Sequence, residues 1–451
     1  MNRILLAVFA ALCGFVLDCF AVDTSTPPNV VFIVSDDHGW TDYGFLGHKQ
    51  IQTPHLDRLA AQSLVFRRGY VPSSLCCPSL ASIITGRYPH QHKIVGNDPP
   101  EQKGVDKATK DKLFREGREA MTRHLEAVPT LPKLLASKGY LSLQTGKWWQ
   151  GDFSRGGFTH GMTKGQRHGD EGLDIGRKTM QPIDDFIGTA RQEKKPFFVW
   201  YAPMMPHDPH TPPQRLLDKY KAKTDSLHVA KYWAMVEWFD ETCGDLLKLL
   251  DKHSVAENTI VVYVTDNGWI QKTEGPGFAP KNKTSPYNMG LQTPIMIRWP
   301  GRVSPKMSEG LAASIDLVPT VLKAVGIDSP EGLPGLNLLD EPEVSKRKSV
   351  FGECYTHTLV DLNEPAKSLL WRWTVEGRWR LIVPRTHNAT GEFAKIPEDA
   401  RLTPALRRTL EIAKPELYDI QADPLEERNL ADQHPEVVKA MLGKLDAWWR
   451  P

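Results

Sequence analysis

The sequence predicts an α/β fold: a large, mixed and mostly parallel sheet flanked by helices on both faces, followed by a smaller C-terminal antiparallel sheet with one helix. Apolar runs such as NVVFIVS (29–35), FFVWYA (197–202) and NTIVVYVT (258–265) alternate with helical segments, as in parallel sheets covered on both faces. After about residue 345 the pattern changes to short strand-like runs and a terminal helix from about Pro435.

Helix signals follow several of these strands. Thr53 and Pro54 are typical of an N-cap and a first helical position. A second helix is expected from Pro78 onward, and a long amphipathic helix precedes the strand at 258–265. The charged, weakly patterned stretch 101–124 is interpreted as a surface insertion.

Three segments are expected along the chain: a signal peptide over 1–21, a catalytic domain over 22–345 and a C-terminal subdomain over 346–451. The first has a basic residue, an apolar run and a small residue at Ala21, the pattern of a cleaved secretory signal. A membrane anchor is the alternative, but the run is short and contains Asp18. We therefore expect export, to the periplasm or outside the cell, without stable membrane insertion.

Composition narrows the classes of partner. The 451 residues carry a formal net charge of +2, which gives no reason to expect nucleic acid as a partner. Six cysteines, two of them within the signal segment, are too few for a disulfide scaffold in a chain of this length.

Oxygen-rich pairs end two of the expected strands: Asp36-Asp37 and Asp266-Asn267. One such pair alone is typical of a solvated turn. Two pairs brought together at the carboxyl edge of a parallel sheet form an all-oxygen site suited to Ca²⁺ or Mg²⁺. Buried together, their negative charge would require a cation.

Three basic side chains are expected at the same edge. Lys147 and His207 follow two further strands, and Lys283 lies in the loop after Asp266-Asn267. Each alone is compatible with a surface lysine or a loop histidine, but their convergence indicates a lining for an anionic group such as sulfate or phosphate.

Cys76 and Cys77 stand at the start of the helix expected from Pro78, where the helix dipole favours negative charge. Cys76 is the predicted position of the nucleophile. A thiolate is a poor match for a hard, oxygen-bound cation, which suggests that the working atom is oxygen.

These motifs resemble the type I formylglycine-dependent sulfatases of the alkaline phosphatase superfamily. CCPSLASIITG (76–86) is similar to that family's Cys-x-Pro-Ser-Arg-x4-Thr-Gly stretch, with Cys76 in the position of the converted cysteine. The resemblance implies oxidation of Cys76 to formylglycine by a formylglycine-generating enzyme. It also implies one divalent cation, Ca²⁺ in preference to Mg²⁺, and catalytic roles for Cys76, Lys147, His207 and Lys283. The implied metal ligands are Asp36, Asp37, Cys76, Asp266 and Asn267.

The sequence departs from the family pattern at its centre. Leu80 replaces the usual arginine, Trp149 replaces a histidine that contacts the nucleophile, and Asn288 and Gln292 replace an acid and an arginine. The residues considered as compensation are Arg87, His90, His92 and Arg155. His38, after the first acidic pair, is interpreted as a polar residue that supports the metal ligands.

The predicted function is hydrolysis of a sulfate ester on a carbohydrate, with Trp148 and Trp149 as candidates to stack on sugar. Two alternatives remain open. A phosphodiesterase or phosphonate monoester hydrolase would share the fold, the metal and the nucleophile. An inactive module that binds sulfated glycans would explain the departures at Leu80 and Trp149.

Overall fold

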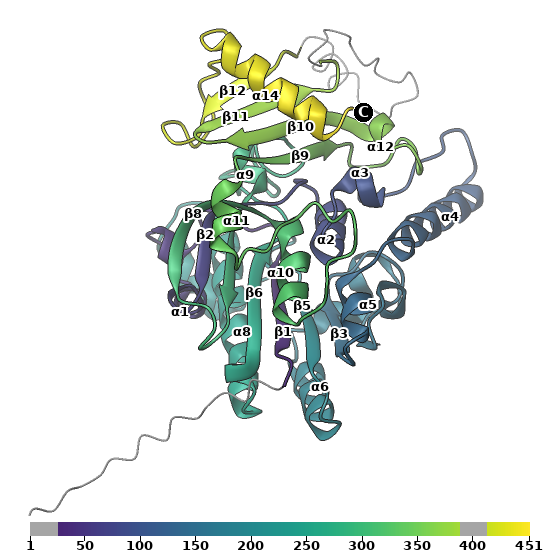
Figure 1. The fold of residues 1–451 in the computed structure, drawn as a ribbon, viewed down its shortest axis with the longest axis vertical. Helices are drawn as coiled ribbons and strands as arrows, with labels where there is room; N and C mark the ends of the chain where they lie inside the picture. The colour runs from purple at the N-terminus through teal and green to yellow at the C-terminus, as the bar shows by residue number, and fades with distance from the viewer. Residues whose placement is uncertain (1–25, 388–412) are drawn as a thin grey trace, which may run out of the picture.

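The computed structural model describes residues 26–387 and 413–451 (Figure 1). Within these ranges, eight strands form one sheet in the order β4-β3-β5-β1-β6-β7-β2-β8, and four form a second sheet in the order β12-β11-β10-β9. The predicted fold class is therefore confirmed. The predicted signal peptide, residues 1–21, lies outside the described residues, and export remains a prediction.

The large sheet brings polar strand ends to one edge. Its strands are β1 (Asn29–Ser35), β2 (Leu64–Tyr70), β3 (Leu141–Gly146), β4 (His160–Gly161), β5 (Phe197–Ala202), β6 (Thr259–Thr265), β7 (Gln292–Arg298) and β8 (Lys306–Ala313). All pairings are parallel except those of β7, which runs antiparallel to both of its neighbours. The carboxyl ends of β1, β3, β5 and β6 consequently meet at the same edge.

Helices cover both faces of this sheet, because successive side chains of a strand point to opposite sides. Val30 and Phe32 of β1 belong to one core, shared with α2 (Cys76–Thr85), α5 (Leu131–Ala136) and α10 (Leu317–Ala324). Val31 and Ile33 belong to the other, shared with α1 (Pro54–Ala61), α6 (Gln181–Gln192) and α8 (Leu227–Lys252). The remaining α-helices of the described residues are α3 (Pro89–His92), α4 (Lys107–Glu126), α7 (Gln214–Lys221), α9 (Asn288–Leu291), α11 (Glu341–Lys346), α12 (Pro365–Ser368) and α14 (Pro435–Trp448).

Most of the charged stretch at 101–124 falls in the 20-residue helix α4, which the sequence reading did not anticipate. Asp106 caps it by accepting a hydrogen bond from the Thr109 backbone N–H at 3.0 Å. Met121 and Leu125 are buried in the core beside α5. Many charges of this stretch face solvent, but one stripe of the helix packs against the sheet layer.

The second sheet consists of β9 (Ser349–Tyr355), β10 (Leu369–Glu376), β11 (Trp379–Pro384) and β12 (Glu416–Asp419), all antiparallel. Helix α14 packs on it, with Leu442 and Leu445 against Leu381 and Val383 (Figure 1). The predicted boundary at residue 345 falls within α11, and the division into domains remains a prediction. None of the helices in the described ranges combines the length and apolarity needed to cross a membrane.

A buried ion pair fastens this sheet to the loop that carries Lys283. Arg380 of β11 pairs with Glu426 at 3.0 Å, and both side chains are almost fully buried. Glu426 accepts a hydrogen bond from the Asn288 backbone N–H at 2.6 Å, and Arg380 donates to the carbonyl oxygen of Pro286. The second sheet thus holds the loop at Pro286 and Asn288, a few residues after Lys283.

Replacing one member of this pair is expected to destabilise the fold strongly. Arg380→Met leaves the buried Glu426 carboxylate without its cation, a loss that typically costs about 3–5 kcal/mol of the free energy of unfolding. Denaturant unfolding measures the loss. The double variant Arg380→Met/Glu426→Gln is expected to regain a large part of it, because no buried charge is then left unpaired. A cost below about 1 kcal/mol for the single variant, a value typical of exposed pairs, would contradict this account.

Candidate functional site

The predicted site residues meet at the carboxyl edge of the large sheet. One ligand atom from each of Asp36, Asp37, Cys76 and His207 lies within 4.8 Å of the others. Apart from His207, which is partly buried, these residues are fully buried. Segments more than 170 residues apart in the sequence therefore converge on one point.

Asp37 is the centre of this cluster. Its backbone N–H donates to Asp266 Oδ1 at 3.1 Å, and its Oδ1 accepts a hydrogen bond from Asn267 Nδ2 at 2.6 Å. These contacts join the ends of β1 and β6, as predicted. Asp37 has φ = 58°, an uncommon conformation for a non-glycine residue that is often found at functional sites.

Lys147 reaches the cluster from the end of β3. Its Nζ lies 2.7 Å from Asp36 Oδ1 and 3.5 Å from Asp266 Oδ2, and its backbone N–H donates to the Ala202 carbonyl oxygen at 2.6 Å. Gly146 makes this approach possible: it has φ = 74°, and a Cβ there would lie 1.8 Å from the Ala202 oxygen.

Lys283 and His207 lie on the other side of Asp37. Lys283 Nζ donates to Asp37 Oδ2 at 2.6 Å. His207 Nε2 is 3.4 Å from both Lys283 Nζ and Asp37 Oδ2. All three predicted basic residues therefore lie at the carboxylate cluster, and their individual roles stay predictions.

The charges of the cluster shift one another's pKa values. Burial alone would raise the pKa of Asp36, but the ammonium groups around it, Lys147 first, lower it overall. Burial and then the charge of Asp36 raise the pKa of Asp266. Burial lowers the pKa of His207, which favours the neutral imidazole. The two lysines compensate two of the three carboxyl groups, and the raised pKa of Asp266 shows that the third is costly to ionise without a further cation.

The donor set fits a hard divalent cation. Asn267 Oδ1 and Asp266 Oδ2 are buried and accept no hydrogen bond from any described residue. Carboxylate and amide oxygens are the ligands that Ca²⁺ and Mg²⁺ prefer, and a cation here would compensate the excess carboxylate charge. Asp36, Asp37, Asp266 and Asn267 would hold such an ion beside Cys76.

The two adjacent cysteines have different surroundings. Cys76 begins α2 and belongs to the carboxylate cluster, and burial raises the pKa of its thiol to about 12. Cys77 points elsewhere: its Sγ accepts a hydrogen bond from Gln150 Nε2 at 3.0 Å. Of the two thiols, Cys76 is therefore the one in the carboxylate cluster, and its role as the nucleophile position stays a prediction, whereas Cys77 packs in the interior.

The two central departures from the family pattern are neighbours in space. Leu80 and Trp149 line one small cavity of about 10 Å³ together with Cys77 and Gln150. Trp148 and Trp149 are only 3% and 4% exposed. The expectation that they stack on sugar is therefore wrong, because both indoles are packed in the interior.

This packing predicts the effect of restoring an arginine at position 80. A cavity of about 10 Å³ accepts at most one water molecule, so Leu80→Arg must displace Trp149 or bury an unpaired charge. We expect a lower melting temperature for Leu80→Arg and a smaller loss for Leu80→Arg/Trp149→His. Additive effects of the two substitutions on the free energy of unfolding would contradict a direct coupling.

The residues considered as compensation lie elsewhere. His90 pairs with Glu353, and His92 Nε2 is 3.0 Å from Ser82 Oγ. Arg155 pairs with Glu119 and Glu126, and Arg87 donates to the Gly332 carbonyl oxygen. The proposal that any of them replaces the missing groups is therefore wrong. Asn288 and Gln292, the other two departures, hydrogen bond to each other at 2.7 Å.

His38, predicted to support the metal ligands, contacts Tyr43, Tyr263 and Asp42 through its ring, and the supporting role stays a prediction. Its ring is fully buried, stacks on Tyr43 at 4.1 Å between centroids, and lies 3.3 Å from both the Tyr263 hydroxyl and the Asp42 carbonyl oxygen. Burial lowers its pKa to about 3, so the imidazole is neutral.

Sequence reasoning missed His168, in the 3₁₀ segment η3 (Arg167–Asp174). Its ring lies 4.5 Å from that of Trp149 and 6.1 Å from that of His207. Burial, followed by the charge of Lys147, lowers its pKa to about 3. The sequence signal was weak: two glycines, Gly165 and Gly169, around a short polar stretch.

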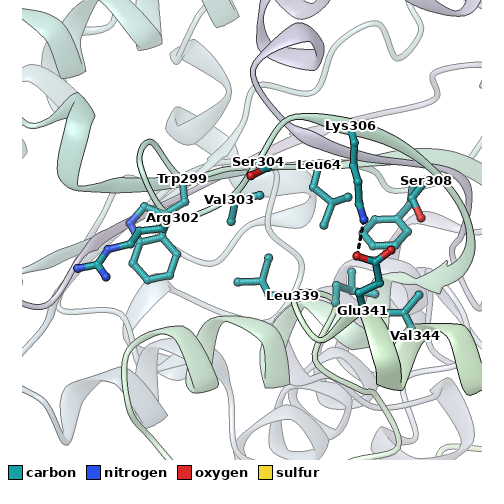
Figure 2. Close-up of a pocket in the computed structure, with 12 residues that line it drawn as sticks. Leu64, Trp299, Arg302, Val303, Ser304, Lys306, Ser308, Leu339, Glu341 and Val344 are labelled. Carbon is teal, nitrogen blue, oxygen red and sulfur yellow. Dashed lines mark hydrogen bonds and ion pairs between the residues drawn. The ribbon is translucent and has the colours of Figure 1, made fainter.

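A separate cavity of about 230 Å³ lies at the opposite edge of the sheet, where β2 and β8 begin (Figure 2). Its lining is mainly apolar, including Leu64, Trp299 and Val344, and Lys306 pairs with Glu341 at 2.6 Å across its rim. It holds no cluster of nucleophilic or metal-ligating groups comparable to that around Asp37.

Comparisons with known proteins give one matching family model and several similar proteins. The family model described as Sulfatase matches residues 28–327. Arylsulfatase A of Homo sapiens is 27% identical over 479 residues, covering 92% of this chain and 86% of that protein. N-acetylgalactosamine-6-O-sulfatase of Bacteroides thetaiotaomicron is 23% identical over 514 residues, covering 94% and 93%. The crystal structure of Ps i-CgsB in complex with k-i-k-neocarrahexaose has a TM-score of 0.71 at 21% identity, covering 94% and 93%.

Proposed function

The chain belongs to the sulfatase family and is a sulfuric ester hydrolase, and we propose that it removes sulfate from a carbohydrate with a formylglycine made from Cys76. The resemblance seen in the sequence motifs is thereby confirmed at the level of the family. The observation that carries the proposal is the cluster of buried carboxylates and lysines around the Cys76 side chain.

The charge of this cluster suits a sulfate ester. With Asp266 ionised, as it would be beside a bound cation, the three carboxylates of Asp36, Asp37 and Asp266 face two ammonium groups, Lys147 and Lys283, and together carry a net charge of −1. A divalent cation changes this to +1, which complements the single negative charge of a sulfate ester. A phosphate monoester dianion would be matched less well.

The basic residues have distinct roles in the proposed reaction. Lys147 and Lys283 stabilise the charge that develops on the sulfate oxygens. His207, beside Lys283, helps the departing alkoxide by donating a proton, which it must first acquire because its pKa is lowered. Lys283 is the alternative proton donor. Burial of the cluster excludes water and strengthens each of these interactions.

Two additions would complete the site: conversion of Cys76 to formylglycine, and a divalent cation. The hydrated aldehyde would supply a hydroxyl nucleophile in place of a thiol, and the cation, Ca²⁺ in preference to Mg²⁺, would polarise the sulfate. Asp36, Asp37, Asp266 and Asn267 would hold the cation. The thiol of Cys76 is raised in pKa and buried, so without conversion it is a poor nucleophile.

The carbohydrate substrate is supported by a relative. N-acetylgalactosamine-6-O-sulfatase of Bacteroides thetaiotaomicron is named for a sulfated sugar. Its alignment with this chain, at 23% identity, covers 94% of the chain. Export to the periplasm or outside the cell, predicted from residues 1–21, would place the protein where such glycans are found. A formylglycine-generating enzyme is the implied partner for maturation.

Kinetics with matched esters test this function. The protein, produced with a formylglycine-generating enzyme, is assayed for sulfate release from sulfated saccharides and from an aryl sulfate, phosphate diester and phosphonate monoester of one leaving group. The proposal predicts preference for the sulfates, loss of activity on chelation, and recovery with Ca²⁺. Preference for the phosphorus esters would favour the phosphodiesterase or phosphonate hydrolase alternative, and saccharide binding without turnover would favour the inactive module.

A further inference from the structure

A second group of positive charges lies beside the catalytic cluster, around the ring of Trp149. The guanidinium carbons of Arg167 and Arg118 lie 5.0 Å and 5.3 Å from the ring centroid. Lys147 Nζ lies 6.0 Å from the same centroid, so Arg167 and Lys147 are within about 11 Å of each other. The Trp149 ring therefore has three cationic groups around it, one of which is the site residue Lys147.

This group has an excess of positive charge. Arg167 Nε and Nη2 each lie 3.1 Å from an oxygen of Asp98. Arg118 donates to the carbonyl oxygens of Asn97 and Trp149, and none of the ion pairs among the described residues includes it. Of the two guanidinium groups, Arg167 is paired with a carboxylate and Arg118 contacts carbonyl oxygens. Arg167 Nη1 makes none of the hydrogen bonds found within the described residues, and the side chain is 42% exposed.

The imidazole of His357 lies beside Asp98, and because burial lowers its pKa it adds a hydrogen-bonding ring to the group rather than a charge. Its Nδ1 lies 3.8 Å from Asp98 Oδ2, and its Nε2 lies 3.4 Å from Asn97 Nδ2. The Asn97 side chain in turn accepts a hydrogen bond from the Cys77 backbone N–H at 2.9 Å. The His357 side chain is half exposed, so it forms part of the rim and is linked through Asn97 to the start of α2.

The loop that presents Arg167 is held in an unusual conformation. His168, Gly169 and Asp170 have φ values of 71°, 114° and 43°. The Asp170 carboxylate accepts hydrogen bonds from backbone N–H groups, those of Lys164, Gln166 and Glu171. The Trp148 backbone N–H donates to the His168 carbonyl oxygen at 3.1 Å.

The Arg167–Asp98 ion pair contributes too little stability to offset the cost of this backbone conformation. Left-handed non-glycine residues cost stability and cluster at ligand-binding positions, whereas a solvent-accessible ion pair contributes little. Neither Arg167 nor His357 contacts the carboxylate cluster, so the hydrolytic mechanism does not use them. A ligand that meets the exposed edge of Arg167 would account for both the loop and the charge.

We infer that Arg167 and His357, with Arg118 adding charge beneath them, form a subsite for a second anionic group of the glycan substrate. That group is a carboxylate or a further sulfate, on the sulfated sugar or on the sugar next to it. This inference rests on the proposed function and narrows it to polyanionic glycans. The Arg167 guanidinium is a planar group with N–H donors in fixed directions. It can therefore donate two hydrogen bonds at once to the two oxygens of a carboxylate or to two of the three terminal oxygens of a sulfate ester.

Steady-state kinetics of Arg167→Ala test the subsite. The matured protein is assayed with 4-nitrophenyl sulfate, glucosamine 6-sulfate, glucosamine 2-N,6-O-disulfate and a monosulfated disaccharide containing a uronate. We expect KM for substrates with the second anion to rise about 10- to 100-fold, the range of a charge-assisted hydrogen bond, with kcat little changed. Values for 4-nitrophenyl sulfate and glucosamine 6-sulfate should stay within about twofold of those of the parent protein.

The two substrates with a second anion distinguish a sulfate from a carboxylate at the subsite. A control variant shows whether the loss of any surface arginine has the same effect. An effect confined to the disulfated sugar assigns a second sulfate, and one confined to the uronate assigns a carboxylate. Arg302 lines the cavity at the opposite edge of the sheet (Figure 2), and the control variant Arg302→Ala should leave kcat and KM for all four substrates unchanged. Equal losses on all four substrates, or no loss on any, would overturn the inference.

Calorimetry keeps this test independent of turnover. The unmodified protein, with Cys76 intact, is titrated with glucosamine 2-N,6-O-disulfate and with the uronate disaccharide. At least one of the two should bind the parent protein about 10-fold or more tightly than it binds Arg167→Ala, whether or not any ester is hydrolysed. Binding of both that is unchanged by the substitution, or no binding of either to the parent protein, would overturn the subsite. A failure of hydrolysis alone would instead count against the proposed function.

Discussion

Cys76→Ala abolishes sulfate ester hydrolysis, and Cys77→Ala keeps most of it: this contrast is the largest effect expected from any pair of single substitutions in the chain. The two thiols are adjacent in sequence, but only Cys76 lies in the carboxylate cluster. Cys77 accepts a hydrogen bond from Gln150 and lines a small apolar cavity. Removal of the nucleophile leaves only the binding and electrostatic parts of catalysis.

Two controls make this result interpretable. Both variants should unfold at temperatures close to that of the parent protein, because alanine removes only one buried sulfur in each case. Cys76→Ala should still bind a sulfated saccharide, since Lys147 and Lys283 are unchanged. Comparable activity of the two variants, or a larger loss in Cys77→Ala, would contradict the assignment of Cys76.

Lys147→Ala and Lys283→Ala are each expected to lower kcat by about 100- to 1,000-fold, the range for removing one group that stabilises charge in a transition state. Lys147 Nζ is bound to Asp36 and Lys283 Nζ to Asp37, on two sides of the cluster. Each would therefore contact a different sulfate oxygen. The loss should fall on kcat more than on KM, because the charge it stabilises develops during the reaction.

An exposed lysine serves as the matched control for both. Lys164 pairs with Glu171 on the surface, and Lys164→Ala should leave kcat within about twofold of the parent value. The double variant Lys147→Ala/Lys283→Ala should lose less than the product of the single losses, because both lysines act on one site. A loss confined to KM in either single variant would show that the lysine binds sulfate equally before and during the reaction.

The proximity of most site residues could be predicted from the sequence, because the carboxyl ends of parallel strands meet at one edge of the sheet. The pairs Asp36-Asp37 and Asp266-Asn267 follow β1 and β6, which are hydrogen-bonded neighbours, so their proximity was predictable from strand position alone. Lys147 and His207 follow β3 and β5 in the same way. The cysteine pair was located by the helix signal at Pro78, close to the observed start of α2 at Cys76.

What could not be predicted depends on contacts between distant segments. The packing of Leu80 against Trp149 requires α2 and the loop after β3 to meet, and neither residue alone indicates this. His168 enters through a left-handed backbone segment whose geometry depends on the Asp170 carboxylate. The four residues considered as compensation were chosen for their chemistry, but each has another partner in the fold. Side-chain partners are set by the tertiary structure rather than by sequence spacing.

The second sheet contributed more to the site than its sequence suggested. Its strands carry few groups with obvious chemistry, yet Arg380 and Glu426 hold the loop from Lys281 to Asn288. Lys283 lies on that loop, and so its position depends on contacts made by the second sheet and the segment that follows it. A lower kcat of Arg380→Met, measured at a temperature at which the variant is still folded, would reflect this dependence.

Mass spectrometry of the tryptic peptide 69–87 tests the central claim most directly. The protein is produced in its native host or beside a formylglycine-generating enzyme, and the peptide carries both Cys76 and Cys77. The account predicts an aldehyde at Cys76, detected by the mass decrease from thiol to aldehyde and by reaction with a hydrazide, with Cys77 unmodified. Two intact thiols under these conditions would contradict a formylglycine nucleophile and favour a module that binds sulfated glycans without hydrolysing them.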